Sequence, residues 1–222
     1  MYITGNTIVN YMLAQGMIVR RGRDVVNVVY LEGSNLDLTP NTDLPDRFND
    51  RGLLIVENNP NDFQVVSNHA CTSEPGLAAT WSREAKLLGG VARITIGQQV
   101  AWRPGLHKPS QYRKGHPALV QVAPVMVHRD QNRDMRRTGD IVTTATGINH
   151  HGTQPGWRGK FIGMWSMGCM VRPNWADHLD FFDLCLEDAE YRDNKNFLFP
   201  SAVLDCGALN RWVKEKTIKQ NA

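Results

Sequence analysis

Repeating patterns of apolar and polar residues predict the helices and strands of this chain. Apolar residues recur at helical spacing over residues 6–19 and 173–187, with Asn6 expected as the N-cap of the first helix. A further helix is expected over residues 208–217. Dense β-branched or alternating runs predict strands at residues 24–31, 52–57, 63–67, 91–102, 117–129, 140–146 and 197–205. Residues 33–51 are rich in Asn, Asp, Pro and Thr and are expected to form a long loop.

Many short strands with a few helices predict a mainly β (α+β) fold. The chain has 222 residues, of which 41% are apolar, so it can bury one sizeable core. We expect a single catalytic domain over residues 1–222. Its parts are a leading helix within residues 1–22, a β core over residues 24–205 and a C-terminal helix within residues 206–222.

The charge and cysteine patterns narrow the expected partners. The net charge is +3, and Lys and Arg are dispersed rather than gathered in one block, so no nucleic-acid partner is expected. Polar residues interrupt the apolar stretch over residues 1–17, which predicts neither a signal peptide nor a membrane span. The protein is therefore expected to be made in the cytoplasm. The four cysteines are too widely spaced for a zinc motif and are expected to be reduced thiols.

One cysteine and one histidine are distinguished by the residues around them. Cys169 ends the run Ser-Met-Gly-Cys of residues 166–169, and His151 lies eighteen residues earlier, directly before a glycine. A free thiol has a pKa of about 8.5, and a nearby imidazole is the usual group that lowers it and activates the nucleophile. The N–H groups of Gly168 and Cys169 are expected to face a developing oxyanion. Adjacent strand residues point to opposite faces, so only one of His150 and His151 can face the thiol.

These residues resemble the catalytic motif of the L,D-transpeptidase (YkuD-type) family, whose members act on peptidoglycan through a Cys nucleophile. The resemblance covers about residues 115–175. It implies an L,D-transpeptidase-like β-sandwich or barrel with a few peripheral helices, and a catalytic motif within residues 150–172. By this resemblance Cys169 is the nucleophile, His151 is the base and Gly168 forms part of the oxyanion hole.

Further residues near the motif are expected to bind substrate. Arg172 lies three residues past Cys169, whereas the family usually has this residue two past the cysteine. One step along a strand reverses the face of a side chain, so Arg172 is expected either to contact a substrate carboxylate or to serve as a structural partner. The other expected substrate-binding residues are Ser166, His150, Trp157 and His116.

The expected reaction is acyl transfer through a Cys thioester on the stem peptides of peptidoglycan, with no cofactor and no metal. Residues 29–33, 72–76, 118–121 and 128–130 resemble segments of phage and prophage proteins, which favours a lysin that hydrolyses wall peptides after its release from the cytoplasm. Two alternatives stay open. One is a zinc-dependent amidase or peptidase that uses His107, His116 and His151. The other is a non-catalytic protein of the cell wall or virion.

Overall fold

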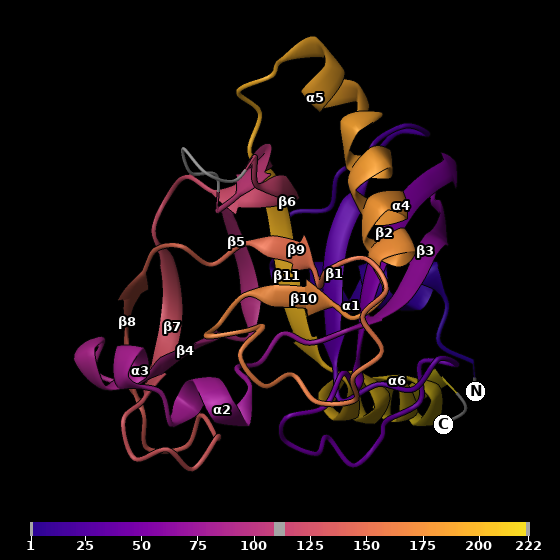
Figure 1. Ribbon diagram of the computed structural model, residues 1–222. Helices are drawn as coiled ribbons and strands as arrows, with labels where there is room; N and C mark the ends of the chain where they lie inside the picture. The colour runs from indigo at the N-terminus through magenta and orange to yellow at the C-terminus, as the bar shows by residue number, and fades with distance from the viewer. Residues whose placement is uncertain (1, 109–113, 221–222) are drawn as a thin grey trace.

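The computed structural model describes residues 2–108 and 114–220 and has the mainly β architecture expected from the sequence (Figure 1). Its larger sheet has eight strands in the order β10-β9-β6-β5-β11-β1-β2-β3. These strands are β1 (Asn27–Glu32), β2 (Asp50–Asn59), β3 (Asp62–Cys71), β5 (Gly97–His107), β6 (His116–Gln121), β9 (His150–Gly152), β10 (Met170–Arg172) and β11 (Phe199–Asp205). A smaller sheet has the order β4-β7-β8, from β4 (Val91–Ile94), β7 (Val125–Asp130) and β8 (Ile141–Ala145).

The larger sheet is buried on both faces. Along β1, Val28 and Tyr30 point into one apolar cluster while Val29 and Leu31 point into another, as the two-residue repeat of a strand requires. The first cluster lies between the sheet, the smaller sheet and α4 (Trp175–Leu186). The second cluster lies under α1 (Gly5–Ala14) and α6 (Cys206–Gln220). The strand predicted at residues 24–31 is therefore confirmed as β1, and both of its faces are buried.

The ends of the larger sheet meet near β10. Thr72, which follows β3, exchanges two backbone hydrogen bonds with Val171 of β10, at 2.9 and 3.0 Å. Strand β10 is thus held by β9 on one side and by Thr72 on the other. This double attachment fixes the short segment that follows Cys169.

Two predicted strands are each divided between the sheets. The run predicted over residues 91–102 breaks between Ile94 and Gly97, whose φ of +127° suits glycine, and gives β4 and β5. The run predicted over residues 117–129 breaks before Val125 and gives β6 and β7. Pro124 has no N–H for a strand ladder, which explains the break. The sequence shows the apolar runs but not the point at which the chain changes sheets.

The helices differ from prediction mainly at their ends. Helix α1 begins after the N-cap Thr4 and ends before Gly16, whose φ is +73°; Asn6 instead accepts a hydrogen bond from the Phe63 N–H. Helix α4 begins after the N-cap Asn174. Short helices α2 (Leu77–Thr80), α3 (Arg83–Leu87) and α5 (Ala189–Asp193) were not predicted. The predicted C-terminal helix is α6; residues 221–222, like residue 1 of the leading segment, lie outside the described residues. Within the described ranges no helix has both the length and the apolar character needed to cross a membrane.

Candidate active site

Strands β9 and β10 run parallel; His151 lies in β9, and Cys169 directly precedes β10. His150 is opposite Met170 and His151 is opposite Val171, so Cys169 enters β10 directly beside the start of β9. His150 and Met170 point into the core and are fully buried. His151 and Cys169 point the other way and line one cavity of about 730 Å³. The alternation of a strand therefore brings His151, and not His150, to the cavity that holds the thiol.

The Cys169 sulfur is held by backbone groups. The Asn149 N–H donates a hydrogen bond to Sγ at 3.4 Å, and the thiol donates to the Gly147 carbonyl at 3.5 Å. Among the described residues, no imidazole forms a hydrogen bond with this sulfur. Burial raises the pKa of the Cys169 thiol, while the Asn149 N–H and the charge of Lys108 act in the opposite direction. This direction is opposite to the lowering that was expected from a neighbouring imidazole.

His151 is oriented by the residue that follows it. Its Nδ1–H donates to the Gly152 carbonyl at 2.9 Å, and because a carbonyl only accepts, the neutral ring carries its lone pair on Nε2. Burial lowers the pKa of His151 to about 4, although the hydrogen bond to Gly152 raises it. The imidazole is therefore neutral at pH 7 and can accept a proton at Nε2.

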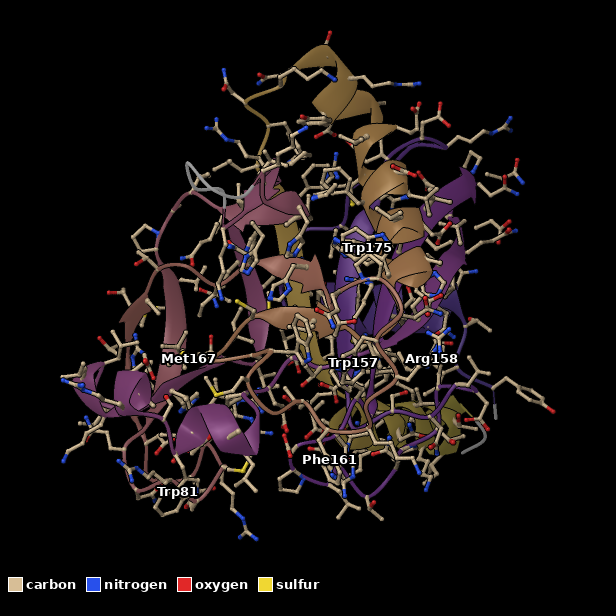
Figure 2. All side chains as sticks on the ribbon, viewed as in Figure 1. Trp81, Trp157, Arg158, Phe161, Met167 and Trp175 are labelled. Carbon is tan, nitrogen blue, oxygen red and sulfur yellow. The ribbon has the colours of Figure 1, made fainter. Side chains whose placement is uncertain are left out.

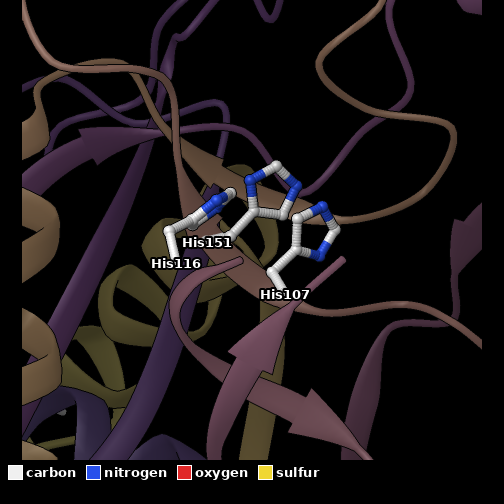
Figure 3. A group of neighbouring side chains, drawn as sticks. All are labelled: His107, His116 and His151. Atoms are coloured by element: carbon white, nitrogen blue, oxygen red, sulfur yellow. The ribbon is translucent and has the colours of Figure 1, made fainter. Parts of the chain in front are cut away.

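Two further histidines lie beside His151 (Figure 3). His107 stacks on the His151 ring with centroids 4.0 Å apart and planes 16° apart, and His116 meets His151 edge-on at 5.6 Å. One ring nitrogen from each of the three lies within 4.8 Å of the others. Burial lowers the pKa of His107 to about 2 and also lowers the pKa of His116. Neutral imidazoles this close together are a candidate metal site.

The hydrogen bonds of Asn149 decide the tautomer of His107. The Gln121 N–H donates to Asn149 Oδ1 at 2.9 Å, so the Asn149 amide nitrogen faces His107 Nδ1 at 2.8 Å and donates to it. With its Nδ1 lone pair occupied, the neutral His107 ring carries its proton on Nε2. A metal bound at Nε2 would require this proton to move and the Asn149 amide to turn against the Gln121 N–H. The hydrogen bonds thus favour a neutral stacking role for His107.

The loop before Cys169 is shaped by Ser166 and Gly168. The Ser166 hydroxyl donates to the Cys169 carbonyl at 2.8 Å and accepts from the Gly168 N–H at 3.1 Å. Gly168 has a φ of +142°, and a Cβ there would lie 2.6 Å from the Ala92 carbonyl oxygen. The Gly168 N–H is therefore already used, contrary to its predicted place in an oxyanion hole. Of the predicted pair, the Cys169 N–H alone has no acceptor among the described residues.

Three predicted substrate contacts lie away from the cavity. Arg172 is fully buried, donates to the Tyr30 hydroxyl at 3.0 Å and lies 3.5 Å above the Phe181 ring. Its structural role, one of the two expected, agrees with this position, whereas contact with substrate does not. His150 is also fully buried, between the rings of Tyr30 and Trp102, and Ser166 is buried within its own loop. The strand repeat and the loop hydrogen bonds turn all three side chains inward.

The two remaining predicted contacts differ in position. His116 lines a second cavity of about 380 Å³ and meets the Trp175 ring at 5.6 Å. Trp157 packs against Phe48 at 5.4 Å and against Trp165 at 6.1 Å, and of these three only Trp165 lines the cavities. Trp157 and Trp175 are both seen beside β9 and β10 in Figure 2. Trp157 therefore supports the wall of the site through Trp165.

Several site residues carried no sequence signal. Lys108 follows β5, Asn149 precedes β9, and Arg129 lies in β7, so the fold brings them together from three parts of the chain. None belongs to a local motif. The one available signal was that Lys108 follows His107, which was itself a candidate zinc ligand.

Comparison of the chain with models of known protein families, with curated proteins and with solved structures gives no match. A functional assignment therefore depends on the site geometry and on the resemblance of the residues around Cys169.

Proposed function

We propose that this protein is a cysteine enzyme that acts on the stem peptides of peptidoglycan, with an L,D-transpeptidase-like arrangement of its strands. The observation that carries the proposal is that Cys169 and His151 reach the same cavity from paired strands, with the His151 ring oriented by the Gly152 carbonyl. A thiol and an oriented neutral imidazole in one cavity are the parts needed for acyl transfer. The Ser-Met-Gly-Cys motif adds the resemblance to wall-acting enzymes.

The proposed reaction begins with both groups neutral. His151 Nε2 accepts the thiol proton while Cys169 Sγ attacks an amide carbonyl, and the Cys169 N–H donates to the oxyanion. The intermediate then collapses to a thioester as the amine leaves with the proton from the imidazolium. Water or a second amine attacks the thioester, its proton passes to His151, and the thiol is restored. Sγ and His151 must come closer in the substrate complex than in the free protein, as catalytic hydrogen bonds often do.

Water is the proposed acceptor, because the phage-like segments favour a lysin over an enzyme that joins peptides. The substrate is then a wall peptide, and the enzyme acts on the cell wall after its release. The resemblance to the family implies a bond that follows an L-configured centre. The mass of the product shows whether water or an amine was the acceptor, and which bond was broken.

Mass spectrometry of purified peptidoglycan incubated with the protein tests this proposal. The wild type is expected to release or join stem peptides, and Cys169→Ala is expected to lose this activity while keeping its thermal unfolding temperature. Cys206→Ser is a matched control, because Cys206 Sγ is buried and donates to the Leu38 carbonyl at 3.5 Å, which a hydroxyl can also do. Peptidoglycan processing by Cys169→Ala would exclude the cysteine mechanism.

A zinc-dependent amidase or peptidase is the second candidate, and the 4.8 Å cluster of His107, His116 and His151 is the observation that favours it. The tautomer of His107 weighs against it. Chelation with EDTA is expected to leave the activity intact, and iodoacetamide is expected to remove it. Loss on chelation with recovery on adding zinc would make the histidine cluster the catalytic centre. A wild type that leaves peptidoglycan unchanged, with or without zinc, would instead favour a non-catalytic protein.

A further inference from the structure

The cavity at Cys169 continues into a second cavity, and together they form one groove. The first has a volume of about 730 Å³ and the second about 380 Å³. They share five lining residues: His107, Lys108, His151, Met164 and Trp165. A substrate can therefore extend from the thiol, past Lys108, into the lobe lined by Trp175. We refer to the two cavities together as the active-site groove.

The active-site groove carries an excess of positive charge. Lys108 and Arg129 line the first lobe, and Lys108 and Lys114 line the second. Glu84 is the one acidic residue among the described residues that line either lobe. Within the described ranges, none of these three cations lies within 4.0 Å of a carboxylate. Their charge is available to a ligand.

Lys108 is the cation best placed to act at the thiol. It follows His107 at the end of β5 and lines both lobes. Its φ of +47° is unusual for a residue with a side chain, so the fold imposes this backbone turn at the groove. Its charge lowers the pKa of Cys169 and of His151, which indicates that the ammonium is electrostatically close to both.

We propose that Lys108 forms an anion subsite beside Cys169 and binds a free carboxylate of the acyl donor. The identity of that donor as a wall peptide rests on the proposed function, whereas the preference of the thiol for anionic reagents does not. The subsite makes the groove selective for peptides that carry an unmodified carboxylate near the reacting carbonyl. A peptide with that carboxylate amidated would leave the Lys108 charge without a partner.

Alkylation of the full chain with iodoacetate and with iodoacetamide tests the subsite. Both reagents form an S–C bond and release iodide, but only iodoacetate is an anion. Cys71, Cys185 and Cys206 are at most 1% exposed, so the fast alkylation reports on Cys169. Lys108→Gln is expected to lower the ratio of the iodoacetate rate to the iodoacetamide rate by about threefold to tenfold at low salt, from the attraction of one unit charge at short range. Any change in the thiolate fraction affects both reagents equally and cancels in the ratio.

Two control variants and the dependence on salt show whether the change in the alkylation ratio comes from the charge of Lys108. Lys108→Arg is expected to keep the wild-type ratio. Lys214→Gln is also expected to keep it, because Lys214 is exposed on α6, which packs on the opposite face of the larger sheet. Added salt is expected to reduce the wild-type ratio toward that of Lys108→Gln. A ratio that Lys108→Gln leaves unchanged would overturn the anion subsite.

Kinetic assays with wall peptides that carry free or amidated carboxylates test whether the subsite acts in the proposed reaction. The wild type is expected to process the free form with a lower KM than the amidated form, and Lys108→Gln is expected to lose this difference in KM. A Lys108-dependent alkylation ratio with no processing of either peptide would overturn the proposed function and keep the anion subsite. Equal processing of both peptides by the wild type would overturn the assignment of the subsite to a substrate carboxylate.

Discussion

Lowering the pH from 7 to 5 is expected to destabilise the folded protein, because four histidines are buried in the neutral form. Burial lowers the pKa of His151 to about 4, of His178 to about 3 and of His107 to about 2, and lowers the pKa of His150 well below its usual value. In the unfolded chain each histidine has a pKa near about 6.5. Below this value the unfolded state binds more protons than the folded state, so stability is lost as the pH falls from 6.5 toward 4.

The size of the loss follows from the same values. A pH of 5 is about 1.5 units below the pKa of each histidine in the unfolded chain. Each of the four histidines therefore lowers the free energy of unfolding by about 2 kcal/mol, or by about 8 kcal/mol together. Asp50 acts in the opposite direction. Burial raises its pKa to about 7, so it takes up a proton in the folded state and returns about 2 kcal/mol between pH 7 and pH 5. The net loss of about 6 kcal/mol is a large fraction of the about 5–15 kcal/mol typical of a domain.

Urea denaturation at pH 7, 6 and 5, followed by tryptophan fluorescence, measures this loss. His150→Phe is the most informative variant, because neither His150 ring nitrogen has a hydrogen-bond partner and the Tyr30 and Trp102 rings surround it. The variant is expected to remove about 2 kcal/mol of the pH-dependent loss. His69→Gln is the control, since His69 is paired with Asp180 near the surface. A stability that is flat between pH 7 and pH 5 would refute the reasoning, since the histidines would then protonate without unfolding.

Three further outcomes test the loop and the hydrogen bonds around the thiol. Gly168→Ala is expected to lower the unfolding temperature and the alkylation rate of Cys169, because the new Cβ would lie 2.6 Å from the Ala92 carbonyl; an unchanged rate would show that the loop tolerates the shift. Ser166→Ala is expected to cost about 1–2 kcal/mol in urea denaturation, because it removes two hydrogen bonds of the loop. His107→Phe is expected to keep the proposed peptidoglycan activity through its stacked ring while His107→Ala reduces it, and equal loss in both would favour a metal-binding or polar role.

The sequence predicted the fold class and the burial of its strands because these depend on periodic patterns. The uninterrupted apolar run from Val28 to Leu31 is visible in the printed residues, and the structure divides its side chains between two apolar clusters. Strands β9 and β10 were not predictable as strands, because each has three residues and exists through pairing with distant segments. The division of residues 117–129 between two sheets likewise depends on packing and only indirectly on Pro124.

The candidate site was predictable where a local rule sufficed. Strand alternation separates His151 from His150, and the same rule turns Arg172 into the core because it lies an odd number of residues after Cys169. The position of Lys108 in the groove was not predictable, because Lys108 reaches it from another strand. His107 was placed near His151 only through the alternative of a zinc site. The hydrogen bond that occupies the Gly168 N–H depends on the turn of the loop, which the motif does not specify.

The neutral state of both reacting groups constrains how the proposed reaction depends on pH. With a pKa of about 4, His151 is mostly unprotonated above about pH 5. Burial raises the pKa of Cys169, so the free protein holds no stable thiolate–imidazolium pair at pH 7. Proton transfer must then accompany attack rather than precede it. An acid limit on activity would follow from unfolding between pH 6.5 and 4, and activity and stability should therefore decline together in that interval.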